Sequence, residues 1–300
     1  MRSHFYHAIV LCALLAPACG RAGSNDAARA SNSAASAAPS TAAAPSSPAS
    51  SPATPTVDGI RRGKEFIDKI RVAAGGDRLT AMRSFEALGV SVMSALPGDR
   101  ALTVRAMYPD FYRQEEIPHT KGGLGVAIGI EGGGLGWMLG ARLGGSARGD
   151  NPQQIQDAYN RAGSQAMAAF LAGVNAPWLV KSGKFTPIAA EPNGSGDDRT
   201  ANIVNLEGPF GRAGRLLIDP GTNLPRRFIE PPQPGPGGAA GRNDLDFSYS
   251  DFREVNGVKL PHTIVRHVGT IQTTWTISTW RINPKIRPIE FTRRIAANVR

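Results

Sequence analysis

Cysteine is nearly absent from this sequence. The 300 residues include two cysteines, of which Cys12 lies in an apolar N-terminal run and Cys19 follows shortly after it. Once that run is removed on export, the rest of the chain has no cysteine pair. A structural disulfide, a thiol nucleophile and a cysteine-based metal site are therefore excluded for it. We expect an ordinary hydrophobic core to stabilise the domain.

The sequence also lacks the motifs that accompany common kinds of catalysis. It contains no G-x-S-x-G and no H-E-x-x-H. His262 and His267 lie on one expected strand at an odd spacing, so they face opposite sides and cannot share a metal ion. Gly132–Gly134 leads into an alternating strand rather than a helix, which argues against a phosphate-binding loop. Glu115 and Glu116 are expected to be solvated. We therefore expect no enzyme activity, no metal and no cofactor.

The N-terminus predicts export. Arg2 precedes an apolar run, and a small-residue A-x-A signal ends at Ala18, so residues 1–18 are interpreted as a secretory signal peptide. An uncleaved membrane anchor is the alternative. Residues 15–19, LAPAC, resemble a bacterial lipobox, in which the cysteine, here Cys19, receives a lipid. Plain cleavage without lipidation is the alternative.

The segment that follows predicts a tether. Residues 19–57 consist mainly of Ala, Ser, Pro and Thr and hold too few large apolar residues to offset the entropy of ordering. We interpret them as a flexible linker. Gly20 is not the aspartate that marks inner-membrane retention, so the predicted location is the periplasm, with a tether to the outer membrane through Cys19.

Residues 58–300 have the length of one domain and begin with a predicted helix. Residues 58–74 carry apolar side chains at helical spacing, and Gly75-Gly76 is expected to end this helix. A second helix is predicted over 151–172, with Asn151 as its N-cap and Gly173 at its end. This second helix is expected to pack on the concave face of a sheet.

The rest of the domain alternates apolar and polar residues, which predicts about ten or eleven strands. Asn256-Gly257 joins two of them and predicts a type I′ hairpin. Asp251 and Arg253 lie two apart, so they share a face of their strand and are expected to pair. Residues 231–242, PPQPGPGGAAGR, are predicted to form a long loop. The predicted fold class is therefore mainly β.

Basic residues outnumber acidic residues, which gives the chain a formal net charge of +10. The basic residues are scattered and form no stripe with aromatic residues between them. Together with the predicted export, this argues against nucleic acid as a partner. We expect a solvated basic surface with a preference for anionic lipid headgroups.

Five segments carry a family resemblance in chain order. They are AAGGDRLTAMRSFEALG (73–89), the strand ending in Gly136-Trp137, LLIDPGTNLPRR (216–227), YSDFREVNGVKLPHTI (249–264) and ISTWRINPKI (277–286). This set resembles exported bacterial proteins of the outer-membrane lipoprotein-sorting, LolA/LolB-like superfamily. The resemblance implies a strongly curved antiparallel half-barrel with a helical lid. It also implies an apolar concave face that binds acyl chains of lipoproteins or other lipids.

The leading hypothesis is thus a non-catalytic cell-envelope protein that binds an acyl chain, a lipid or a lipoprotein in its half-barrel. The candidate lining residues are Trp137, Phe170, Trp178, Tyr249 and Trp275. The alternative for each of them is ordinary core packing. The alternative for the protein is a structural or assembly lipoprotein that contacts an envelope protein partner and binds no lipid.

Overall fold

The computed structural model describes residues 56–119, 125–140, 151–190, 200–208, 211–230 and 245–293. The predicted signal peptide, nearly all of the predicted linker and Cys19 lie outside the described residues, as does the predicted loop at 231–242.

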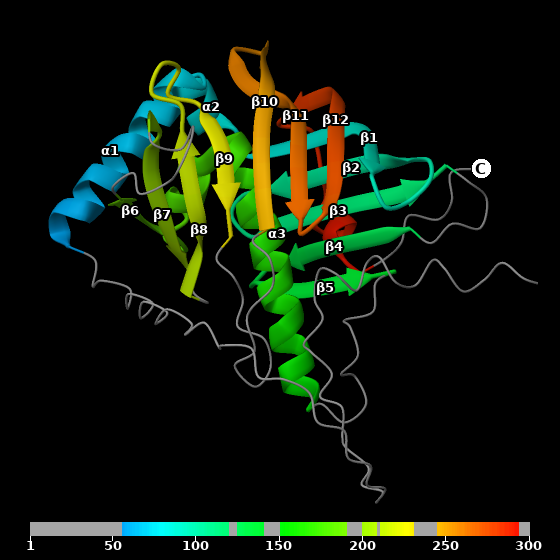
Figure 1. Ribbon diagram of the computed structural model, residues 1–300. Coiled ribbons are helices and arrows are strands. Elements are labelled where there is room, and N and C mark those ends of the chain that lie inside the picture. Colours follow the sequence, from blue (N-terminus) through cyan, green and yellow to red (C-terminus); the bar gives the residue numbers. More distant parts are fainter. Residues whose placement is uncertain are drawn as a thin grey trace, which may run out of the picture.

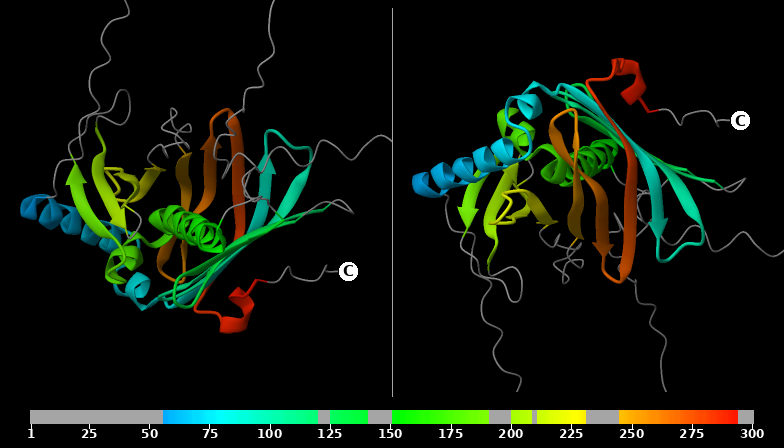
Figure 2. Two further views of the ribbon diagram at one scale, coloured as in Figure 1. Left: turned by 90° about the horizontal axis from the view of Figure 1, so that it is seen from below. Right: turned by 90° about the horizontal axis from the view of Figure 1, so that it is seen from above.

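The described residues form one antiparallel sheet of twelve strands in the order β5-β4-β3-β2-β1-β12-β11-β10-β9-β8-β7-β6. The bounds are β1 Ser84–Met93, β2 Asp99–Met107, β3 Phe111–Pro118, β4 Val126–Glu131, β5 Leu135–Leu139, β6 Thr186–Ala190, β7 Asn202–Gly208, β8 Gly211–Ile218, β9 Pro225–Ile229, β10 Leu245–Val255, β11 Val258–Val268 and β12 Ile271–Ile282. The sheet curves strongly and leaves an open, concave side (Figure 2). The mainly β, half-barrel prediction is confirmed.

The strand count of ten or eleven was too low. Three of the twelve strands, β5, β6 and β9, have five residues each. Alternation over so few positions is a weak signal. In space, the chain builds two antiparallel meanders that meet where β1 pairs with β12.

Helix α3 (Pro152–Lys181) connects the two edge strands, β5 and β6, and crosses the concave side of the sheet (Figures 1 and 2). Asn151 caps it by accepting a hydrogen bond from the Gln153 amide at 2.9 Å, and Pro152 occupies the first turn. The predicted start and the predicted packing on the sheet are both confirmed.

The predicted end of this helix at Gly173 lies two residues before a break at Asn175, where φ is −156° and ψ is 64°. A second helical segment, which was not predicted, continues α3 from there to Lys181. Gly173 allows the Tyr249 ring to pack closely against α3, because a Cβ atom at this position would lie 2.2 Å from that ring. A glycine inside a helix thus marks a packing contact here rather than a C-cap.

Two short-range predictions near the N-terminus are confirmed. Helix α1 (Val57–Ala73) starts after Thr56, whose hydroxyl accepts from the Gly59 amide at 3.0 Å. It ends before Gly75 and Gly76, both at positive φ. Helix α2 (Asp77–Ala81) follows at once. Helix α1 lies along β6 at one edge of the sheet (Figure 1).

The predicted hairpin is also confirmed. Asn256 and Gly257 have φ values of 51° and 79° and join β10 to β11, as a type I′ turn requires. Asp251 has a φ of 54°, and neither it nor His262 opposite is paired, although the register of β10 with β11 is the same on both sides of this position. The Arg253 guanidinium donates to the Asp251 carboxylate at 2.9 and 2.6 Å, which confirms the predicted pair.

The main core lies between α3 and the concave face. Phe170 of α3 is at its centre, with its ring centroid 5.9 Å from that of Phe85 and 6.1 Å from that of Trp275. A short 3-10 helix, η4 (Pro288–Phe291), packs on the opposite, convex face against β3 and β4 (Figure 2).

Candidate functional site

Four of the five predicted lining residues lie in one core cluster with α3. Phe170, Trp178, Tyr249 and Trp275 are all buried in it. Tyr249 packs against α3, and its hydroxyl donates a hydrogen bond to the backbone carbonyl of Ala169 at 2.5 Å. These contacts place the four side chains between α3 and the sheet. Contact between any of them and a ligand stays a prediction.

The predicted position of Trp137 on the concave face is wrong. Its neighbour Gly136 faces α3, because a Cβ atom there would lie 2.2 Å from the Tyr159 carbonyl oxygen. Successive strand residues point to opposite faces, so Trp137 points to the convex side. There its indole N–H donates to the Phe291 carbonyl at 2.9 Å, and the Arg113 guanidinium lies 5.2 Å from its ring. Trp137 therefore holds η4 on the sheet.

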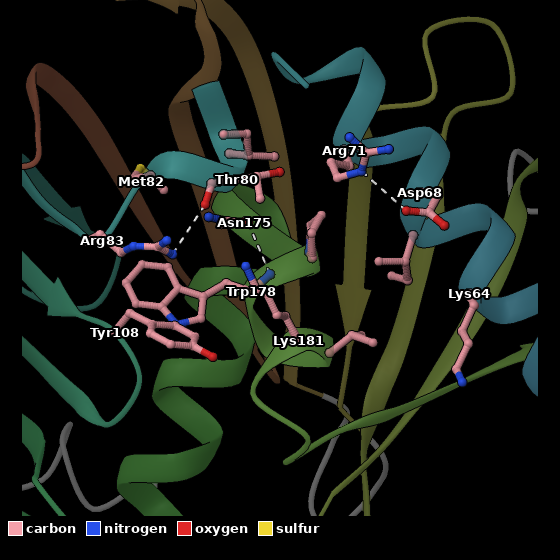
Figure 3. Close-up of a pocket in the computed structure, with 14 residues that line it drawn as sticks. Lys64, Asp68, Arg71, Thr80, Met82, Arg83, Tyr108, Asn175, Trp178 and Lys181 are labelled. Carbon is pink, nitrogen blue, oxygen red and sulfur yellow. Dashed lines mark hydrogen bonds and ion pairs between the residues drawn. The ribbon is translucent and has the colours of Figure 1, made fainter. Parts of the chain in front are cut away.

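A pocket of about 270 Å³ lies where α1, α2 and the last turn of α3 meet the end of β2 (Figure 3). Most of its wall is apolar or aromatic. These residues are Ile67, Leu79, Met82, Tyr108, Pro177, Trp178 and Val180. Trp178 connects this wall to the core: its ring centroid is 5.4 Å from that of Tyr108 and 6.2 Å from that of Phe85. Of the predicted lining residues, only Trp178 contributes to this pocket.

The rim of the pocket is basic. Lys64, Arg71, Arg83 and Lys181 line it together with one carboxylate, Asp68. Arg71 donates to Asp68 at 3.3 Å, so that carboxylate is already engaged. Within the described part of the chain, the other three cations form no ion pair with a side chain. Arg83 makes a 3.5 Å contact with the Thr80 carbonyl oxygen. The mouth of the pocket therefore carries an uncompensated positive charge.

The kink of α3 shapes this pocket. Asn175 lines it and is buried, and its side-chain oxygen accepts from the Trp178 amide at 3.1 Å. This bond caps a new helical turn, with Pro177 in that turn. The sequence Asn-Ala-Pro is itself a helix-start signal, although the predicted helix ended before it. Tyr108 and the basic rim had no comparable signal, because they come from separate elements.

The concave face also holds buried polar side chains. The prediction that Glu115 and Glu116 are solvated is wrong, since both are buried. Glu116 faces the concave side, where it accepts from the Ser91 hydroxyl at 2.7 Å. Glu115 faces the convex side and pairs with Arg113 at 2.5 Å. Successive strand residues point to opposite faces, so the two carboxylates lie on different sides of the sheet and have different partners.

A second pair of buried polar side chains comes from β11 and from the residue that follows β9. Arg266 of β11 and Glu230, just after β9, are both buried. Burial raises the pKa of the Glu230 carboxyl to about 8, against a smaller opposing effect of the Arg266 charge. Burial also raises the pKa values of Tyr112 and Tyr249 well above the ordinary range. These phenols remain protonated donors.

The described residues hold neither a cluster of metal ligands nor a membrane-spanning helix. No three His, Cys, Asp or Glu side chains in the described ranges come together as metal ligands would. None of the described helices is both long and apolar enough to span a bilayer.

No protein-family model matches the sequence, and no curated protein matches it significantly. Several solved structures are similar in fold comparison. A Vibrio parahaemolyticus domain described as outer membrane lipoprotein-sorting is 10% identical, with 78% of this chain and 97% of that chain covered and a TM-score of 0.47.

Two more solved structures give similar values. A DUF1329 family protein from Desulfovibrio piger is 9% identical, with coverage of 77% and 97% and a TM-score of 0.45. A LolA superfamily protein from Nitrosomonas europaea is 13% identical, with coverage of 77% and 97% and a TM-score of 0.43. Two of these three proteins are named for the superfamily that the sequence motifs resemble. With such low identities and TM-scores, the function of this chain has to be inferred from its own residues.

Proposed function

We propose that this protein is a non-catalytic component of the bacterial cell envelope that binds an acyl chain of a lipid or lipoprotein. The observation that carries the proposal is the pocket at Trp178, with its apolar wall continuous with an aromatic core. Its volume of about 270 Å³ is just below the roughly 300–1,000 Å³ of sites for drug-sized molecules. It therefore suits part of an acyl chain rather than a whole lipid.

The charges at the mouth favour an amphiphile with an anionic group. Lys64, Arg83 and Lys181 stand at the rim without an ion-pair partner in the described residues. An acyl chain against Trp178 would leave its polar end near these cations. Because the rim is partly exposed, salt should weaken this attraction.

The lining of the pocket offers little for catalysis. Its described residues include no histidine and no cysteine, and the Thr80 hydroxyl donates to the Gly76 carbonyl at 3.1 Å rather than to a base. A nucleophile needs a base within hydrogen-bond reach. We therefore propose binding rather than a reaction.

The predicted export signal and tether give this binding a location. A signal peptide over residues 1–18 and a lipid on Cys19 would hold the domain in the periplasm at the outer membrane. The linker would let the pocket reach a membrane surface or a lipoprotein partner. The family resemblance of the sequence motifs supports the same environment.

Native mass spectrometry of the full chain tests the proposal. The chain would carry Cys19→Ala, so that no attached lipid is counted, and would be purified without detergent. We expect one acyl-containing species per chain, which organic extraction then identifies. An empty protein that also fails to take up a fluorescent fatty acid would contradict the proposal and favour the structural or assembly role.

A matched pair of variants tests the location. Val180→Trp would fill the pocket that Val180 lines. Val72→Trp places the same indole on α1, at a side chain that is 66% exposed and outside the pocket lining. Displacing two methylenes costs about 1.6 kcal/mol, roughly a tenfold loss of affinity. We expect that loss for Val180→Trp alone. Equal affinities of the two variants would place the binding elsewhere.

A further inference from the structure

A buried polar cluster occupies the concave face at the far end of the sheet from the pocket. Arg266, Trp275 and Glu230 are only 7%, 1% and 5% exposed. The Arg266 guanidinium lies 5.5 Å from the ring centroid of Trp275, which itself packs on Phe170 of α3. Glu230 is two residues beyond Phe228, a core residue, so it points to the same face.

These side chains are short of hydrogen-bond partners. Arg266 Nε, Trp275 Nε1 and Glu230 Oε1 are buried and have none. The one hydrogen bond of the Arg266 side chain within the described residues runs to the Thr273 hydroxyl, at 3.3 Å. Arg266 forms no ion pair in that part of the chain. A buried guanidinium normally has a carboxylate or another acceptor beside it.

The missing partner is an acceptor. Arginine Nε and indole Nε1 are donors only. Burial raises the pKa of Glu230 to about 8, so its carboxyl is mostly protonated at neutral pH and is a further donor. The cluster thus presents donors and one positive charge, and the Glu116 carboxylate on the same face already accepts hydrogen bonds from Ser91 and Gln114. An oxyanion supplies what the cluster lacks.

We propose that Arg266, Trp275 and Glu230 form a second binding site, which takes the carboxylate of a long-chain fatty acid. The Trp275 ring beside the guanidinium gives the anion an apolar neighbour, which favours a carboxylate on an alkyl chain over a small inorganic anion. Carboxylate oxygens accept from guanidinium, indole and carboxyl donors at once.

This site is separate from the pocket at Trp178. Arg83 of the pocket directly precedes β1, while Thr273 pairs with Met93 at the other end of β1. The rings of Phe85 and Phe170 lie between Trp178 of the pocket and Trp275 of the cluster, so the two sites share no residue. The inference goes beyond the function proposed for the pocket. It can be wrong while that proposed function is correct.

Substitution of Arg266 tests the inference on the full chain carrying Cys19→Ala. Calorimetry would measure the affinity for palmitate, hexadecanol, acetate and inorganic phosphate. Arg281→Met is the matched control, because Arg281 is exposed and pairs with Glu86 at 2.6 Å. We expect the parent to prefer palmitate over the other three probes. We expect Arg266→Met to lose at least about tenfold in palmitate affinity and its preference over hexadecanol.

The melting temperature separates a binding role from a structural one. Removing an unpaired buried charge and filling the space with a methionine often stabilises a protein. We therefore expect Arg266→Met without ligand to melt no lower than the parent. A lower melting temperature with unchanged palmitate affinity would overturn the inference and indicate an ordered water instead. Arg266→Lys keeps the charge but loses the Nε donor, and should also bind palmitate more weakly if the methionine variant does not fold.

The two sites are told apart by comparing variants. Palmitate binding that is lost in Val180→Trp but kept in Arg266→Met would overturn this inference and leave the function proposed for the pocket intact. The reverse result would support the second site alone. Equal affinity for acetate and palmitate would also overturn the inference, because it would remove the role of the alkyl chain.

Discussion

Glu230 makes the stability of the protein depend on pH, and Glu230→Gln should remove that dependence. In the unfolded chain its carboxyl titrates near the ordinary value of 4.5, whereas burial in the folded chain raises the pKa to about 8. Between these two values the folded state binds more protons than the unfolded state. Stability therefore decreases as pH rises through this window, and it levels off above the folded-state pKa.

The size of the effect follows from the two pKa values. Each pKa unit corresponds to about 1.4 kcal/mol, so a change from 4.5 to about 8 sets an upper limit near 5 kcal/mol. Local relaxation and water entry around a 5% exposed side chain reduce this limit. We expect a loss of about 2–4 kcal/mol in the free energy of unfolding between about pH 5 and pH 9.

Urea unfolding of the parent and of Glu230→Gln across this pH range measures the effect. The neutral amide cannot ionise, so the variant should become the more stable protein above about pH 7, by about 2–4 kcal/mol at pH 9. Glu254→Gln, at an exposed position on β10, is the control and should follow the parent. Parallel curves for the parent and Glu230→Gln would refute the argument, since they would mean that Glu230 stays ionised in the folded protein.

Two further substitutions test the packing on each face of the sheet. Trp137→Phe removes the 2.9 Å hydrogen bond to the Phe291 carbonyl; it should lower the free energy of unfolding by about 1 kcal/mol and speed hydrogen exchange in η4, and unchanged exchange there would contradict this. Gly173→Ala places a Cβ atom 2.2 Å from the Tyr249 ring; it should lower the free energy of unfolding by about 1–3 kcal/mol, whereas Ser164→Ala on the same helix should change it little.

Local sequence signals predicted most of the elements. The Asn256-Gly257 turn, the Gly75-Gly76 helix end and the Asn151-Pro152 helix start each depend on the backbone chemistry of one or two residues. Such signals act within a few residues, so tertiary contacts did not override them. The same holds for the pairing of Asp251 with Arg253.

The candidate site was less predictable because its geometry depends on distant contacts. Gly173 read as a helix end, but its small size matters for the approach of Tyr249 from another element. Alternation along β5 assigned Trp137 to one of two faces, and nothing in the sequence indicates which face is concave. Glu116 looked solvated because its partner, Ser91, lies on another strand.

The topology explains why the pocket, rather than the whole concave face, is the proposed entry point for an acyl chain. Because α3 connects the two edge strands, displacing all of it would disturb β5 and β6 together. The kink at Asn175 divides the helix into a long segment under the sheet and a short last turn. The pocket is lined by that last turn and by Asn175 itself, together with α1 and α2. A chain that enters at Trp178 therefore meets only the short last turn of α3, which packs in the core through Ala176, Trp178 and Leu179, and it leaves the long segment in place.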